Sequence, residues 1–114
     1  MTQELLTLEL RTDFREFCVT YLVVHEINAI FTRAGIKRGP LPSDRLLKGE
    51  RRTLVEKYYA SLNWHNETDV DTFLKVIGYM LAQRYPSLAP REKLCAMCER
   101  AGLVVDGSQV YRPS

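Results

Sequence analysis

The residues best suited to metal or redox chemistry are two cysteines in a CxxC spacing, Cys95 and Cys98. On a helix, both sulfur atoms of such a pair face roughly one side, where thiolates can bind a metal or exchange with a disulfide. A structural zinc site needs four ligands, and the other candidates, Cys18, His25 and His65, are scattered along the chain. A thioredoxin-like pair stands just after a strand, whereas this pair falls inside a predicted helix. We therefore interpret the cysteines as core residues that need neither metal nor disulfide.

The chain contains no complete catalytic signature. His25 and His65 are possible general bases, but no serine, cysteine or acid stands at a spacing that assembles a site around them. Asp69 and Asp71 are two positions apart, so they do not share a helix face, and they suit a negatively charged first turn. The phosphate-binding patterns GxxxxGK[ST] and GxGxxG are absent. The sequence thus predicts a protein that is not an enzyme and has no cofactor, metal or small-molecule substrate.

Charge is distributed unevenly, although the net charge is only +2. Residues 1–32 carry two basic and five acidic side chains, and residues 33–57 carry eight basic and three acidic ones. An acidic and a basic patch on one small domain permit head-to-tail contact between copies, or contact with a partner domain. The alternative is that both are ordinary solvated helix faces. The candidate partner-binding residues are Glu16 and Glu26 on the acidic side, and Lys48, Arg51, Arg52 and Lys57 on the basic side.

The basic residues lie in or beside an aromatic stretch, GERRTLVEKYYASLNW, at residues 49–64. Tyr58 and Tyr59 fall on the apolar stripe that Leu54 and Leu62 define, so we interpret them as core residues before base-stacking platforms. Trp64 follows this stripe and is expected to be buried between this helix and the next one.

The first element that positions these residues is a helix predicted from Thr12 onward, where apolar residues recur at spacings of three and four. Thr12 or Asp13 can cap its start. The stretch VTYLVV, residues 19–24, is expected to bend or break it, and Gly35 to stop it. Residues 36–49 contain two prolines and two glycines and are expected to form a loop.

Three further helices are predicted. One spans residues 50–62, and its charged side chains fall mostly outside the apolar stripe. The next begins at a cap, Asn66 or Thr68, and runs to about Tyr85, where the following proline ends it. The last spans residues 90–101, with a proline in its first turn and a glycine after its end.

The C-terminal residues 103–112 alternate between apolar and polar side chains around Asp106-Gly107, which predicts a β-hairpin. The fold class expected is therefore mainly α, a compact bundle of four to six helices with a short C-terminal β-hairpin. Helix 90–101 followed by hairpin 103–112 is also the order of a winged helix, which makes nucleic-acid binding the alternative function. A recognition helix needs several exposed bases, and this one has three bases diluted by two glutamates.

The length of 114 residues fits one domain, which is compatible with being the N-terminal part of a larger protein. No apolar run approaches the roughly 20 residues needed to cross a bilayer. The first ten residues carry two glutamates and no basic residue, unlike a signal peptide, and the three cysteines do not suggest a disulfide framework. We expect a cytoplasmic location and no membrane partner.

Three stretches together resemble a known family: IFTRAGI, then GERRTLVEKYYASLNWHNETDVDTFLKVIGYML, then AGLVVDGSQVYR. This pattern of core and cap residues, over roughly residues 20–112, is similar to a small helical domain at the N-terminus of bacterial abortive-infection and related anti-phage defence proteins. Such domains are similar in role to death-fold adaptor modules. The resemblance implies a death-fold-like adaptor that recruits or oligomerises defence components through homotypic protein contacts, without catalytic residues.

Overall fold

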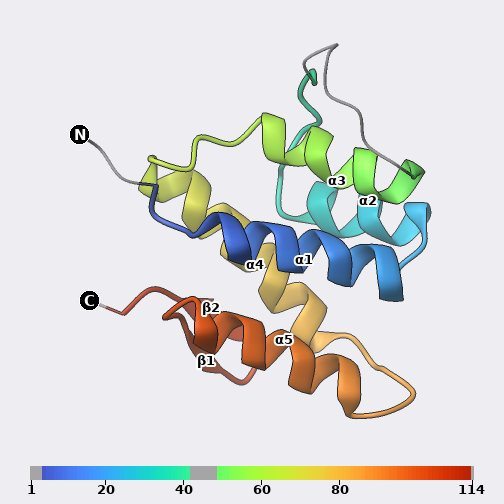
Figure 1. Ribbon diagram of the computed structural model, residues 1–114, viewed down its shortest axis with the longest axis vertical. Coiled ribbons are helices and arrows are strands. Elements are labelled where there is room, and N and C mark those ends of the chain that lie inside the picture. Colours follow the sequence, from blue (N-terminus) through green and yellow to red (C-terminus); the bar gives the residue numbers. More distant parts are fainter. Residues whose placement is uncertain (1–3, 42–48, 114) are drawn as a thin grey trace.

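The structure of the protein is a computed structural model, which describes residues 4–41 and 49–113. Within these ranges the chain forms five helices followed by an antiparallel β-hairpin (Figure 1). The elements are α1 (Leu8–Tyr21), α2 (Val24–Arg33), α3 (Glu50–Ala60), α4 (Glu67–Ala82), α5 (Ala89–Arg100), β1 (Val104–Asp106) and β2 (Gln109–Tyr111). The predicted fold class, a helical bundle with a C-terminal hairpin, is confirmed.

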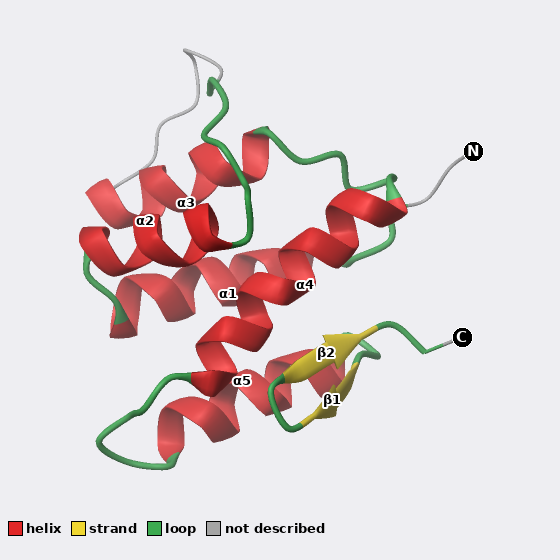
Figure 2. Cartoon of the chain, turned by 180° about the vertical axis from the view of Figure 1, so that it is seen from behind, coloured by secondary structure: helices red, strands yellow, loops and turns green. Residues whose placement is uncertain are grey.

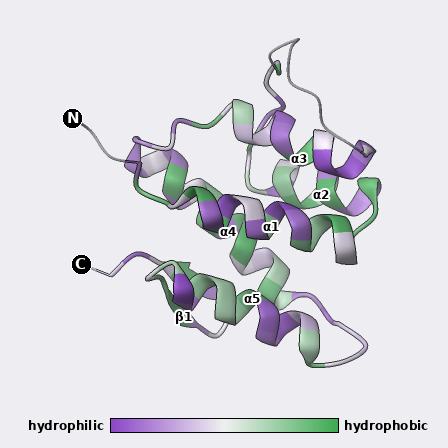
Figure 3. Cartoon of the chain, viewed as in Figure 1, coloured by the Kyte–Doolittle hydropathy of each residue, from purple (hydrophilic) through white to green (hydrophobic). Residues whose placement is uncertain are grey.

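Helix α4 is the central element and the most hydrophobic of the five helices (Figure 3). Helices α2 and α5 and strand β2 all pack against it, while α1 lies between α3 and α5 (Figure 1). The aromatic rings of Phe14, Phe31 and Phe73, from α1, α2 and α4, meet edge to face at centroid distances of 5.4 and 6.4 Å. One continuous core therefore joins all five helices. None of the helices in the described residues is long and apolar enough to cross a bilayer.

The first helix begins earlier than predicted. Its N-cap is Thr7, whose hydroxyl accepts a hydrogen bond from the amide of Leu10 at 3.1 Å, and not Thr12 or Asp13. The earlier start is favoured because Leu10 is buried in the core, so the first turn gains packing as well as a cap. The break expected in residues 19–24 is confirmed, since α1 ends and α2 begins there.

Glycines end two helices as predicted. After α2, Gly35 adopts φ 84°, its amide donates to the carbonyl of Thr32, and the next amide, of Ile36, donates to Phe31. After α5, Gly102 adopts φ 80° in the same arrangement. These are Schellman ends, in which a positive φ lets the chain turn back and satisfy the last carbonyls.

Helix α4 starts as predicted and ends early. Asn66 is its cap and accepts from the amide of Asp69 at 2.9 Å. The helix ends at Ala82 instead of continuing to about Tyr85, because Gln83 is already extended. The Tyr85 hydroxyl instead donates to the carbonyl of Met80 at 2.8 Å, so this tyrosine satisfies a helix end from outside.

The hairpin is confirmed, with its turn shifted by one residue. Asp106 pairs with Gln109, so the two central residues are Gly107 and Ser108 rather than Asp106 and Gly107. Gly107 has φ 63°, as the first central residue of a type II′ turn requires. The turn rests on α4 at Gly78, where an added Cβ would lie 2.5 Å from the carbonyl oxygen of Ser108. A glycine at position 78 therefore allows the hairpin to approach the central helix.

Candidate functional site

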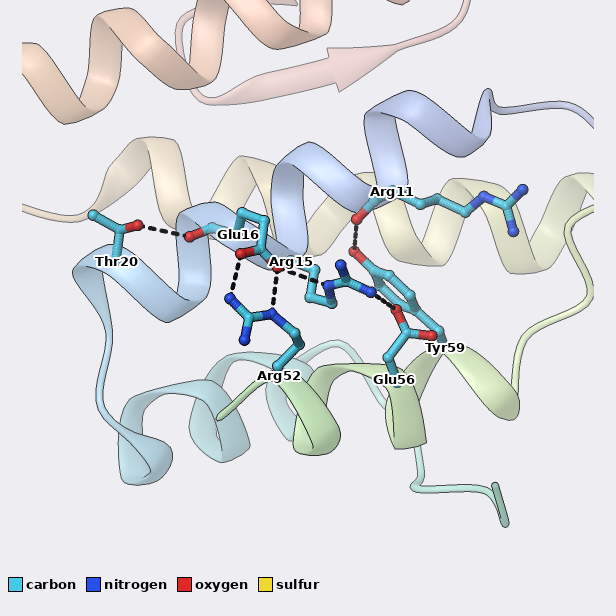
Figure 4. A network of polar contacts seen from close by, with 7 residues as sticks. All are labelled: Arg11, Arg15, Glu16, Thr20, Arg52, Glu56 and Tyr59. Atoms are coloured by element: carbon cyan, nitrogen blue, oxygen red, sulfur yellow. Dashed lines mark hydrogen bonds and ion pairs between the residues drawn. The ribbon is translucent and has the colours of Figure 1, made fainter. Parts of the chain in front are cut away.

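The residues predicted to form two halves of an intermolecular contact include a pair that meets within one chain. The guanidinium of Arg52 on α3 donates to both carboxylate oxygens of Glu16 on α1, at 2.7 and 2.5 Å (Figure 4). Bidentate pairs of this kind are among the stronger hydrogen-bonded ion pairs. Glu16 and Arg52 therefore fasten α1 to α3, which differs from the role expected of them in association.

A second charged pair continues this contact toward the core. Arg15 donates to Glu16 at 2.9 Å and to Glu56 at 2.8 Å, and Glu56 is buried (Figure 4). Beside it, the hydroxyl of the buried Tyr59 donates to the carbonyl of Arg11 at 2.7 Å. We call Arg15, Glu16, Arg52 and Glu56 the α1–α3 seam. It is a chain of four alternating charges, each compensated by a neighbour.

The electrostatics of the seam follow from this pairing. Hydrogen bonding from Arg52, aided by Arg15 and opposed by partial burial, lowers the pKa of Glu16 from its ordinary 4.5 to about 2. Burial alone would lower the pKa of Arg15, but hydrogen bonds to Glu56 and Glu16 raise it. Both groups therefore stay ionised at neutral pH, as the two ends of a structural ion pair do.

The other predicted partner-binding residues are dispersed. Arg51 donates to the carbonyl of Leu22 at 3.0 Å, and Glu26 accepts from the amide of Val23 at 3.0 Å, so both hold the junction between α1 and α2. Lys57 is exposed on α3, and Lys48 lies outside the described residues. The structure thus brings together Glu16 and Arg52 and separates Glu26 and Lys57 from them.

The aromatic stretch packs inward as predicted. Tyr58 stacks on Phe31 at 4.5 Å, and the buried Trp64 meets Tyr59 and Phe73 edge to face at 5.3 and 5.2 Å. The guanidinium of Arg11 lies over the Trp64 ring, 4.7 Å from its centre. These rings are part of the core.

The candidate chemical groups are not gathered into a site. Cys98 and Cys18 are buried and Cys95 is half-buried, so the predicted burial holds for two of the three. Burial raises the pKa of Cys98 to about 12, which keeps its thiol protonated. The two histidines are exposed. No group of three or more potential metal ligands occurs among the residues that the structure describes.

The helix of the winged-helix alternative, α5, has few cations left to contact phosphates. Arg91 donates to the carbonyls of Leu81 and Gly107, both at 2.7 Å, which ties α5 to the end of α4 and to the hairpin turn. Arg100 lies 3.4 Å from Asp13 on α1. Of the three basic residues of this helix, only Lys93 forms neither a hydrogen bond to a carbonyl nor an ion pair among the described residues. Its ammonium lies 5.9 Å from the centre of the Tyr21 ring.

A groove lined by apolar, aromatic and basic side chains lies elsewhere, between α4 and β2. It has a volume of about 650 Å³, and its lining is mostly apolar. One wall is a stripe of α4, and the other wall is the consecutive residues 108–111 of the hairpin. The hairpin packs beside α4 through β2 (Figure 2). We call it the α4–β2 groove. The stripe of α4 consists of Asp71, Leu74, Lys75, Gly78, Tyr79 and Ala82.

Aromatic and basic side chains edge this groove. Arg33, at the end of α2, stacks its guanidinium 4.2 Å from the centre of the Tyr79 ring. Tyr111 on the hairpin is 46% exposed. Lys75 is exposed, and no acidic group of the described residues lies within ion-pair distance of Lys75 or Arg33. Asp71 faces Arg112 at 3.7 Å. The groove therefore offers two cations that form no ion pair among the described residues, beside exposed aromatic surface.

Sequence reasoning missed the α4–β2 groove. Its walls are distant in the sequence, and neither stands out when read alone. The one available signal was Gly78, an isolated glycine inside a helical pattern, which often marks a close approach by another segment.

Compared with protein-family models, with curated proteins and with solved structures, the chain matches none.

Proposed function

We propose that this protein is a non-enzymatic protein–protein interaction domain, and that its partner docks in the α4–β2 groove. The observation that carries the proposal is the groove itself: mostly apolar, edged by Tyr79, Tyr111 and Arg33, with no acidic group of the described residues within ion-pair distance of Arg33 or Lys75. Tyrosine and arginine are the residue types most enriched at the energetic centres of protein interfaces. A planar guanidinium already stacked on an aromatic ring also loses little freedom on binding.

The groove replaces the charged surface as the proposed contact. Association through Glu16 of one copy and Arg52 of another would first have to break their pair within each chain. Breaking a bidentate ion pair to form another of the same kind yields little net free energy. The proposed partner is therefore a different protein rather than a second copy bound through the seam.

The biological setting of this proposal comes from the family resemblance. A recruitment domain of a bacterial anti-phage or abortive-infection system brings other components together without chemistry of its own. A groove that binds one segment of a defence effector is suited to that role, because recruitment needs a specific and reversible contact.

Site-specific photo-crosslinking in cells tests the proposal. A photoreactive benzoylphenylalanine replaces Tyr111 in the groove, and in a matched control it replaces Tyr21, which is 37% exposed at the end of α1. We expect a discrete protein adduct from position 111 and none from position 21. Equal adducts at both positions, adducts to nucleic acid, or no adduct at position 111 would contradict the proposal.

A further inference from the structure

The outer edge of β2 offers unpaired backbone groups. The hairpin pairs Asp106 with Gln109, Val105 with Val110 and Val104 with Tyr111. In an antiparallel pair, hydrogen-bonded and non-hydrogen-bonded positions alternate, and the pair that closes a two-residue turn is hydrogen-bonded. The amide and carbonyl of Val110 therefore point away from β1. Within the described residues, no hydrogen bond from another element reaches them.

The α4–β2 groove runs along this edge of the strand. Successive side chains of a strand point to opposite faces, so a pocket on one face would be lined by alternate residues. This groove is lined by all three residues of β2 and by Ser108 of the turn, which is expected when it follows the strand edge. The absence of a side chain at Gly78 lets the turn of the hairpin pack directly against α4, which places the edge of β2 beside the groove.

The charges beside the edge select the composition of a partner. Arg33 and Lys75 stand on the α4 side of the groove without an acidic neighbour at ion-pair distance in the described residues. The acid among the lining residues, Asp71, faces Arg112 at 3.7 Å. A strand laid between β2 and α4 would direct alternate side chains toward these cations and the others toward the apolar floor. Acidic residues that alternate with apolar ones fit both requirements.

From these observations we infer that the groove binds an extended segment of a partner protein, with alternating acidic and apolar residues, as a third strand on the edge of β2. The inference rests on the proposed function and specifies the partner and the way it binds. Main-chain hydrogen bonds at Val110 would supply affinity, and Arg33 with Lys75 would supply selectivity. Edge strands that stay open are templates for such pairing.

Two proline variants isolate the strand edge. Val110→Pro removes the outward amide of β2 while leaving the bonds between the strands intact. Val105→Pro is its matched control, because it makes the same change at the paired, equally half-buried position, whose amide points to the other edge of the hairpin. Circular dichroism and melting temperature of both variants establish that they fold.

The probe is a short fluorescent peptide of alternating valine and glutamate, titrated by anisotropy. Two comparison peptides replace glutamate with lysine, or carry N-methyl groups on the amides of one edge. We expect Val110→Pro and the N-methylated peptide each to weaken binding about tenfold or more, the loss of one or two good hydrogen bonds. Val105→Pro should change it less than about twofold. The amide of Val110 should exchange more slowly with solvent when the peptide is bound.

Three outcomes would overturn the inference. They are no binding of the glutamate peptide up to about 1 mM, equal effects of the two proline variants, and equal binding of the glutamate and lysine peptides. Arg33→Gln with Lys75→Gln should weaken binding of the glutamate peptide, whereas Lys37→Gln with Lys57→Gln, both exposed elsewhere, should not.

If position 111 still crosslinks a protein while Val110→Pro has no effect, the proposed function stands and strand addition fails. If position 111 crosslinks none, the proposed function fails independently.

Discussion

The α1–α3 seam and the α4–β2 groove both contain arginine, but the surroundings of the arginines are opposite. In the seam, Arg15 and Arg52 each pair with a carboxylate of the neighbouring helix, so their charges are neutralised within the chain. In the groove, Arg33 stacks on Tyr79 and meets no acid at ion-pair distance among the described residues. The comparison teaches that an arginine-rich segment indicates a binding surface only when the fold brings no carboxylate to it. Four perturbations test this difference, and we take the largest expected effect first.

Replacing Trp64 with alanine should have the largest effect. This ring is 9% exposed and packs against Tyr59, Phe73 and the guanidinium of Arg11. We expect Trp64→Ala to lower the free energy of unfolding by about 3–5 kcal/mol, as large-to-small aromatic changes in cores do. The groove counterpart, Tyr111→Ala, should stay within about 0.5 kcal/mol. Denaturant unfolding of both variants measures this difference. Comparable losses of unfolding free energy in the two variants would contradict the prediction.

Neutralising the buried end of the seam should follow. Glu56→Gln keeps the shape of the side chain but takes a full charge from the hydrogen bond with Arg15. Bonds to charged groups contribute about 1.5–3 kcal/mol, so we expect a loss in that range in the same unfolding experiment. The control is Lys57→Gln, one residue along α3 and exposed, which should leave stability unchanged. If Glu56→Gln also left the free energy of unfolding unchanged, the ion pairs of the seam would not contribute to stability.

The contact that positions the groove should be less costly to disturb. Gly78→Ala gains about 1 kcal/mol of helix propensity, but the new Cβ meets the carbonyl of Ser108 in a fit whose strain costs about 1–3 kcal/mol. We expect a net loss of about 1–2 kcal/mol. Amide exchange should rise in β1 and β2 while it stays slow in α1 and α3. A stabilised variant with an unchanged hairpin would mean that the turn yields easily.

The sequence predicted local features better than the surfaces. Helix stops at Gly35 and Gly102, the cap at Asn66 and the burial of Trp64 all follow from a few neighbouring residues, and all are confirmed. The ion pair of Glu16 and Arg52 joins positions far apart in the sequence, which only the packing of α1 on α3 brings together.

The open groove was beyond reach for the same reason. Its walls come from α4 and the hairpin, and nothing in either stretch read alone tells which stripe of α4 lies beside the hairpin. Charge counts along the chain placed an excess of five cations in residues 33–57. They could not distinguish Arg52, which pairs within the chain, from Arg33, which does not.

The smallest expected effect concerns pH and the exposed end of the seam. Because the pKa of Glu16 is lowered in the folded protein to about 2, its ion pair stabilises the fold above about pH 4.5, and this contribution is lost as pH falls toward 2. Solvent screens this partly exposed pair, so we discount the contribution to about 1 kcal/mol. Glu16→Gln should therefore be less stable than the unaltered protein at pH 7 by that amount, and the two should converge near pH 2. Urea unfolding at a series of pH values measures the difference in unfolding free energy, from which the contributions of the other carboxyl groups cancel.

Arg52→Gln should show the same convergence, since it removes the main cause of the lowered pKa of Glu16. A gap that persists unchanged at pH 2 would assign the loss to packing and not to charge, and no gap at pH 7 would mean that Glu16 is available to a partner after all.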